Sequence, residues 1–176
     1  MRQTMDQITL DIPELNYKKL LYDDKDNVSD QGRATAFESQ NKKYHLAGYT
    51  KDNTQYKQAF PDKEDFINFG KSLFDRCTVA VMQQAPGQVL PEHVDTFYMI
   101  SKNYGVDPAE CCRVNIFLED WQSGHYFEIN NTPITKWKRG DAIIIQKDEP
   151  HLSANSGMRP KYTMQVTGVR NEFKRR

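Results

Sequence analysis

The chain has 176 residues, enough for one domain with a sizeable core. Its 24 Lys and Arg residues balance 24 Asp and Glu residues, so the charge does not call for a nucleic acid or an anionic membrane as partner. No apolar run is long enough to span a bilayer, and the N-terminus lacks the apolar core of a signal peptide. We therefore expect a globular protein that uses neither a membrane nor a nucleic acid.

Cysteine usage indicates the redox compartment. The three cysteines are an odd number and two of them, Cys111 and Cys112, are adjacent, which argues against a disulfide framework. Together with Cys77 they also lack the spacing of a zinc site. We expect a reducing, cytoplasmic location.

The composition of residues 1–76 predicts a polar N-terminal segment. Residues 23–61 are rich in Asp, Lys, Asn, Gln and Ser and show no strong apolar period, which predicts loops with a strand around residues 44–49. This stretch could close over a site as a lid, or it could cover a sheet edge. Residues 62–76 carry apolar side chains at roughly helical spacing, which predicts a helix that packs against a sheet.

The remainder, residues 77–170, reads as a β-rich core. Residues 111–119 alternate cleanly, and Asn130-Asn131-Thr132-Pro133 between two apolar runs is a hairpin signal. About eight short strands with turns between them predict a mainly β fold, a double-stranded β-helix or jelly roll with one or more flanking helices, in a single domain over residues 1–176. The other expected strands cover residues 78–82, 88–90 continuing over 93–100, 126–129, 134–137, 142–146 and 161–169.

Three residues could hold a metal ion. His93 and Asp95 are two residues apart, so on a β-strand their side chains point to the same face. His151, returning from a distant part of the chain, could complete a triad of two histidines and one carboxylate. Such a triad leaves one face of the metal open and suits non-haem Fe(II) enzymes that activate oxygen. The other histidines, His45 and His125, lack an acidic partner at strand spacing, and we favour structural roles for them.

A buried cation could bind an acidic co-substrate. Lys161 lies ten residues after His151, and Thr163 shares its strand face. A cation deep in a barrel is costly without an anion to neutralise it, and a dicarboxylate such as 2-oxoglutarate would supply one. Arg159 is a competing candidate, and Arg113 could also point inward from its strand.

These residues lie within a wider pattern. From about Ala80 to Val169 the chain resembles the Fe(II)/2-oxoglutarate-dependent oxygenases, especially the prolyl-hydroxylase-like branch. The resemblance implies that His93, Asp95 and His151 bind Fe(II), that Lys161 binds the far carboxylate of 2-oxoglutarate, and that O₂ is the second co-substrate. It also implies hydroxylation of a C–H bond in a peptide residue or a small molecule. The matching motifs are Pro86-Gly87, His93-Val94-Asp95, Arg113, residues 116–121, 124–127 and 137–141, Pro150-His151 and Lys161-Tyr162.

Two other classes stay open. A cupin-like jelly roll could use the same metal ligands without 2-oxoglutarate, although cupins usually place more histidines at the metal than this spacing allows. A non-catalytic binding module would make His93 and His151 incidental. The sequence identifies neither the substrate nor the oligomeric state, because one fold supports many functions.

Overall fold

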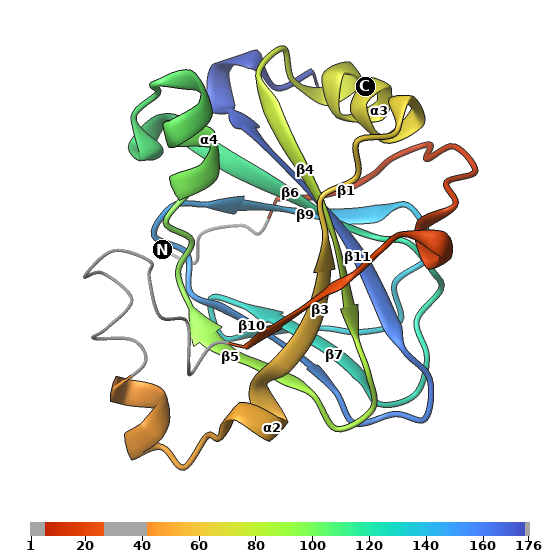
Figure 1. The fold of residues 1–176 in the computed structure, drawn as a ribbon, viewed down its shortest axis with the longest axis vertical. Coiled ribbons are helices and arrows are strands. Elements are labelled where there is room, and N and C mark those ends of the chain that lie inside the picture. The colour runs from red at the N-terminus through yellow and green to blue at the C-terminus, as the bar shows by residue number, and fades with distance from the viewer. Residues whose placement is uncertain (1–5, 27–41, 175–176) are drawn as a thin grey trace.

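Two antiparallel sheets form the body of the protein, in a computed structural model that describes residues 6–26 and 42–174. The seven-stranded sheet has the order β1-β9-β6-β11-β4-β3-β2, and the four-stranded sheet has the order β5-β10-β7-β8. Figure 1 shows the four-stranded sheet below the larger one, with the helices α3 and α4 toward the top of the view. The strands are β1 Gln7–Thr9, β2 Asp23–Asp26, β3 Gln55–Ala59, β4 Cys77–Gln84, β5 Val89–His93, β6 Cys111–Phe117, β7 His125–Ile129, β8 Thr132–Ile134, β9 Asp141–Gln146, β10 His151–Asn155 and β11 Lys161–Val169.

The eight strands β4 to β11 wind between the two sheets as a double-stranded β-helix. Strands β4, β6, β9 and β11 belong to the larger sheet, and β5, β7, β8 and β10 form the smaller one. The predicted hairpin is present between β7 and β8, where Asn130 and Asn131 have φ of 50° and 59°. Positive φ at both turn residues matches the twist of a two-residue hairpin. The expected mainly β jelly roll with flanking helices is confirmed.

Helices are few. Besides helical residues 42–46, the described part contains α2 Lys51–Thr54, α3 Glu64–Leu73 and α4 Tyr98–Tyr104, with 3₁₀ turns η1 Tyr17–Lys19, η2 Pro108–Glu110 and η3 Arg170–Glu172. The helix predicted over residues 62–76 is α3, with narrower bounds. No helix in the described ranges is long and apolar enough to cross a membrane.

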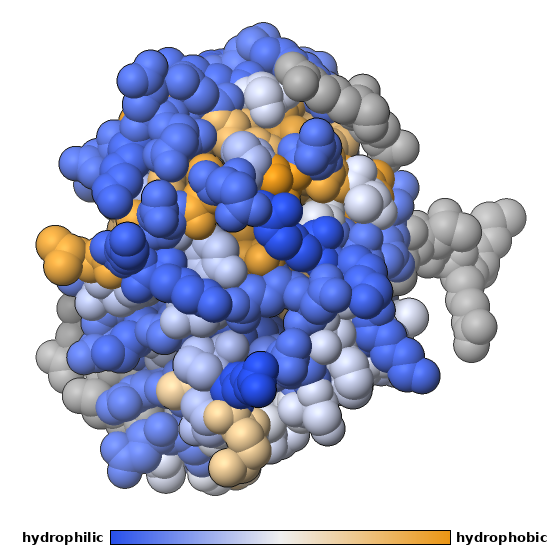
Figure 2. Space-filling model, turned by 90° about the vertical axis from the view of Figure 1, so that its right-hand side faces the viewer, coloured by the Kyte–Doolittle hydropathy of each residue, from blue (hydrophilic) through white to orange (hydrophobic). Residues whose placement is uncertain are grey.

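The first core layer lies between α3 and the outer face of the larger sheet. Phe66 from the first turn of α3, Leu73 from its last turn and Phe74 just after it pack on the strand face that carries Val114 and Val166. This is the apolar face expected from the alternation in residues 111–119. On the side of the molecule that carries α3, hydrophobic side chains gather in the upper half of a largely hydrophilic surface (Figure 2).

The second core layer fills the space between the sheets. Phe117 and Ile143 from the larger sheet meet Phe127 and Ile129 from the smaller one. The ring of Trp137 stacks on Phe117 with centroids 4.0 Å apart and an interplanar angle of 9°. This layer occupies one end of the barrel, so polar side chains can line the interior beyond it.

The N-terminal segment departs from expectation. Residues 42–46 are helical, so the strand predicted over residues 44–49 is wrong. The prediction of loops over residues 23–61 is also wrong where β2 and β3 extend the larger sheet from β4, while residues 27–41 lie outside the described part. Strands at a sheet edge keep one solvent-facing side and gain their order from backbone pairing, so their composition carries little apolar signal.

The strand expected over residues 93–100 is wrong as well. Strand β5 ends at His93, and α4 begins at Tyr98 after an irregular stretch over 94–97. Phe97, which precedes the helix, has φ of 51° and is buried. Its ring packs with Ile100 and Val106, so tertiary burial overrides a local pattern that is also compatible with a strand.

Candidate metal centre

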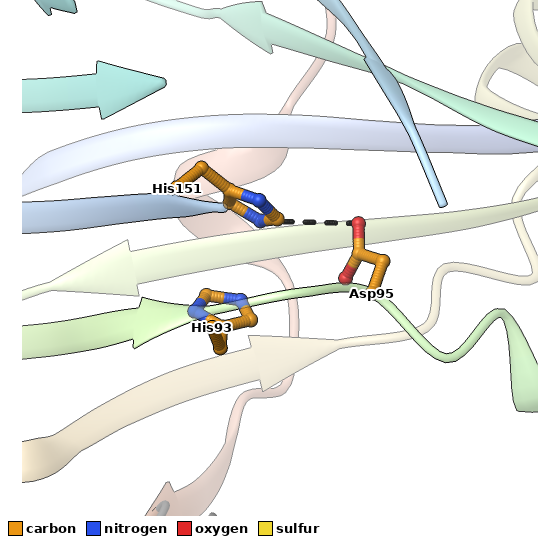
Figure 3. Close-up of side chains that lie close together, drawn as sticks. All are labelled: His93, Asp95 and His151. Carbon is orange, nitrogen blue, oxygen red and sulfur yellow. Dashed lines mark ion pairs between the residues drawn. The ribbon is translucent and has the colours of Figure 1, made fainter. Parts of the chain in front are cut away.

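His93 and His151 meet across two neighbouring strands. His93 is the last residue of β5, His151 is the first residue of β10, and the two are register partners. Their ring centroids are 4.2 Å apart. Asp95 lies two residues beyond the end of β5 and turns back toward them (Figure 3). One ligand atom from each of the three residues lies within 4.8 Å of the others, so the structure brings together the triad that the sequence suggested.

Backbone carbonyls orient both imidazoles. The Nδ1 atom of His93 lies 2.8 Å from the carbonyl oxygen of Pro91, and Nδ1 of His151 lies 2.9 Å from that of Glu149. A carbonyl oxygen only accepts, so Nδ1 carries a hydrogen in both rings, and in a neutral ring Nε2 keeps its lone pair. Burial, followed by the neighbouring His151, lowers the pKa of His93 to about 4. Neutral imidazoles with Nε2 free are the form that binds a metal.

Asp95 is held by one oxygen and free at the other. Its Oδ1 accepts a hydrogen bond from Nη1 of Arg113 at 2.7 Å. Its Oδ2 is buried, has no hydrogen-bond partner among residues 6–26 and 42–174, and lies 3.9 Å from Nε2 of His151. Although burial raises the pKa of Asp95, the Arg113 guanidinium holds it below its ordinary value. A buried carboxylate oxygen without a partner is costly, and a divalent cation beside the two imidazoles would satisfy it.

A cavity of about 160 Å³ adjoins the triad. His93 is only partly buried and lines this cavity with Asp95 and Arg113, whereas His151 is buried. Exposed apolar side chains stand among its lining residues: Phe60, Val94, Tyr98 and Met99. The centre therefore has one face toward an accessible cavity and its other face toward the barrel interior.

Lys161 is the buried cation of the interior. It is 3% exposed, and its Nζ donates to the carbonyl of Tyr126 at 2.5 Å and to Oγ of Ser153 at 2.6 Å. A longer bond of 3.3 Å reaches the carbonyl of Ala154. No carboxylate of residues 6–26 or 42–174 lies within 4.0 Å of Nζ, and burial lowers its pKa to about 7. Thr163 is also buried, on the same side of β11.

The two arginines considered from the sequence lie away from the ammonium of Lys161. Arg159 is exposed, and its backbone carbonyl, not its side chain, accepts bonds from His125 and Asn155. The structure thus places the Arg159 side chain away from the interior. Arg113 lies beside Asp95 on the metal side rather than beside Lys161. The Nε2 atom of His125 lies 3.0 Å from the carbonyl oxygen of Arg159, and His45 is exposed, so neither histidine belongs to the triad.

Sequence reasoning missed two contributors to the centre. Thr167 accepts a hydrogen bond of 3.1 Å from Nε of Arg113 through its Oγ1. Phe97 lies under the same guanidinium, with its ring centroid 5.7 Å from Cζ. The sequence signal that could have indicated Thr167 was the alternation of β11, which puts Lys161, Thr163 and Thr167 on one face. The pairing of Thr167 with Arg113, however, depends on strand register.

Comparisons with known proteins support the fold. No family model matches the chain, and no curated protein matches it. A solved structure from Thermotoga maritima, described as a predicted oxalate decarboxylase, has a TM-score of 0.50 at 12% identity and covers 89% of this chain and 99% of that chain. The Cnp3 cupin domain of Schizosaccharomyces pombe has a TM-score of 0.43 at 13% identity, covering 65% of this chain and 64% of that one. A Cupin_2 domain of a transcriptional regulator from Enterobacter cloacae has a TM-score of 0.40 at 16% identity, covering 65% and 94%.

The fold is a double-stranded β-helix. Its strand order and the Thermotoga likeness agree on this point, whereas identities this low show the fold alone. The choice of metal and of reaction therefore depends on the residues of the site.

Proposed function

We propose that this protein is an Fe(II)- and 2-oxoglutarate-dependent dioxygenase that hydroxylates a C–H bond of a peptide residue or a small molecule. The observation that carries the proposal is the buried Oδ2 of Asp95, which has no hydrogen-bond partner in the described part of the chain and lies beside the imidazoles of His93 and His151. Two histidines and one carboxylate leave enough metal positions open for a chelating co-substrate and O₂. When bound, Fe(II) would supply the oxygen activation.

The 2-oxoglutarate assignment is supported by the surroundings of Lys161. Its contacts are neutral oxygens, so a buried ammonium there would lack a counter-charge in the described chain. Ser153, which contacts Nζ, is two residues from His151 on β10, and both side chains are buried. A dicarboxylate could therefore meet the metal with one end and Lys161 with the other, which would neutralise both.

Neighbouring groups of the chain hold the three metal ligands in position. The carbonyls of Pro91 and Glu149 hold the two imidazoles, and Arg113 holds the carboxylate, so the ligands are ordered before the metal arrives. The ring of Phe127 lies 6.2 Å from that of His151 and excludes water from the inner side. The three cysteines are free, which fits the cytoplasmic location we propose.

The test is an anaerobic titration with Fe(II) and 2-oxoglutarate. Chelation by the keto acid should give a weak visible charge-transfer band, and admission of air should convert 2-oxoglutarate to succinate. His93→Ala should abolish the band, whereas Lys161→Met should shift the titration to higher 2-oxoglutarate. A band that never forms, although Fe(II) binds, would replace the proposal with a cupin-like metal protein that does not use 2-oxoglutarate. Absence of Fe(II) binding would leave a non-catalytic module.

A further inference from the structure

Arg113 presents part of its guanidinium to the cavity beside the metal centre. Its Nε donates to Thr167, and its Nη1 donates to Asp95. Its Nη2 donates to no group in residues 6–26 or 42–174, and the side chain is 19% exposed among the cavity-lining residues. A guanidinium whose Nε and Nη1 already donate keeps Nη2 as a donor for a carboxylate. Arg113 therefore brings one remaining charged donor to the lining of the cavity.

The charges around the cavity favour an anion at that donor. Asp95 is the one acidic residue among the cavity-lining residues that the structure describes, and Arg113 is the one Lys or Arg. Their charges cancel in the metal-free site. A divalent cation on Asp95 adds two positive charges and Lys161 adds one, while 2-oxoglutarate returns two negative charges. One positive charge stays uncompensated, and a partly buried excess charge is stabilised by an anionic ligand.

The rest of the cavity is suited to an apolar body. Met82 and Leu90 pack together in its wall, and Phe60 and Met99 are exposed at its edge. Apart from Asp95, the polar groups that line the cavity near Arg113 are uncharged, Thr167 and Gln165 among them. A ligand with one carboxylate and an aliphatic or aromatic body would match both parts of this surface.

We propose that Arg113 binds a carboxylate of the primary substrate, so that the enzyme acts on a small organic acid with an apolar body. The inference builds on the proposed function, since it assigns 2-oxoglutarate to Lys161 and the primary substrate to Arg113. Arg113 thus has two tasks: it positions Asp95 through Nη1 and binds the substrate through Nη2. A charge-assisted contact of this kind discriminates an acid from its amide.

The experiment uses butyrate as the probe acid and butyramide as its neutral counterpart. The full chain is loaded with Zn(II), which does not undergo redox chemistry, and saturated with 2-oxoglutarate. Binding is followed by NMR on the Arg113 Nε–H signal, which is assigned by its absence from Arg113→Gln. Butyrate should move this signal saturably and bind at least about tenfold more tightly than butyramide. Arg113→Gln should bind butyrate about tenfold or more weakly, while the matched surface variant Arg159→Gln should behave as the wild type.

Any of the following three results would overturn the inference. An Arg113 signal that butyrate leaves unmoved, or equal butyrate affinity in Arg113→Gln, removes the anion site. Competition between butyrate and 2-oxoglutarate would place the acid at the co-substrate position instead. If Arg113→Gln also loses Zn(II), the wild-type signal and the acid-to-amide preference decide the question. Failure of the Fe(II)–2-oxoglutarate band with a normal butyrate response would reject the proposed function and keep the anion site, so the two failures are distinguishable.

Discussion

Lys161 should make the metal-free protein more stable as pH rises above neutral. Burial lowers its pKa from 10.5 to about 7, a difference that corresponds to about 5 kcal/mol. Because the unfolded chain binds the proton more tightly, it takes up more protons between pH 7 and 10.5, and stability therefore increases across that window. Between pH 7 and pH 9 the expected gain is about 2 kcal/mol. Lys161→Met removes the titrating group, so this gain should disappear.

The assay is urea unfolding of metal-free wild type and Lys161→Met at pH 7, 8 and 9. The difference between the two proteins isolates the contribution of Lys161, because other titrating groups are common to both. Lys71→Met, at an exposed position on α3, is the control and should follow the wild type. Saturating 2-oxoglutarate should reduce the pH dependence of the wild type, since an anion beside Nζ favours the charged form. Parallel profiles for wild type and Lys161→Met would refute the idea that the ammonium is destabilised by burial.

Three further predictions concern the centre and the packing. Asp95→Ala should lower Fe(II) affinity at least about tenfold in an equilibrium metal titration, because one of three ligands is lost, and unchanged affinity would exclude Asp95 as a ligand. Gly168→Ala should destabilise the fold by about 1–3 kcal/mol in urea unfolding, since a Cβ there would lie 2.1 Å from Cγ of Phe74; a neutral result would mean that the ring moves freely. Trp137→Ala should cost about 3–5 kcal/mol by the same measurement, because its ring is 3% exposed and stacks on Phe117, and a loss below about 1 kcal/mol would contradict that packing.

Strand alternation and residue spacing account for much of the β-rich core. The period of two in residues 111–119 identified the apolar face that packs under α3, and it placed Arg113 on the opposite, interior face. Similarly, the buried pattern of β11 follows from its sequence and puts Lys161 and Thr163 on one side. These features are local, because the side-chain direction along a strand depends only on the position within it.

Secondary structure was predicted wrongly from the local sequence where contacts with distant residues decided the conformation. Residues 94–97 leave the strand because Phe97 is buried against Ile100 and Val106. Strand β3 is ordered by pairing with β4, and β2 by pairing with β3. Their own compositions contain no apolar alternation that could reveal this. The irregular backbone after His93 is also what turns Asp95 back toward His151.

The sequence by itself determined which residues could serve the centre: two histidines, a carboxylate and a buried lysine at fixed spacings. Only the tertiary structure decided that β5 and β10 pair with His93 opposite His151, that Arg113 holds one oxygen of Asp95, and that Arg159 lies outside. The physical reason is that side-chain direction is a local property of a strand, whereas strand register and the burial of partners depend on the closure of both sheets around a common core.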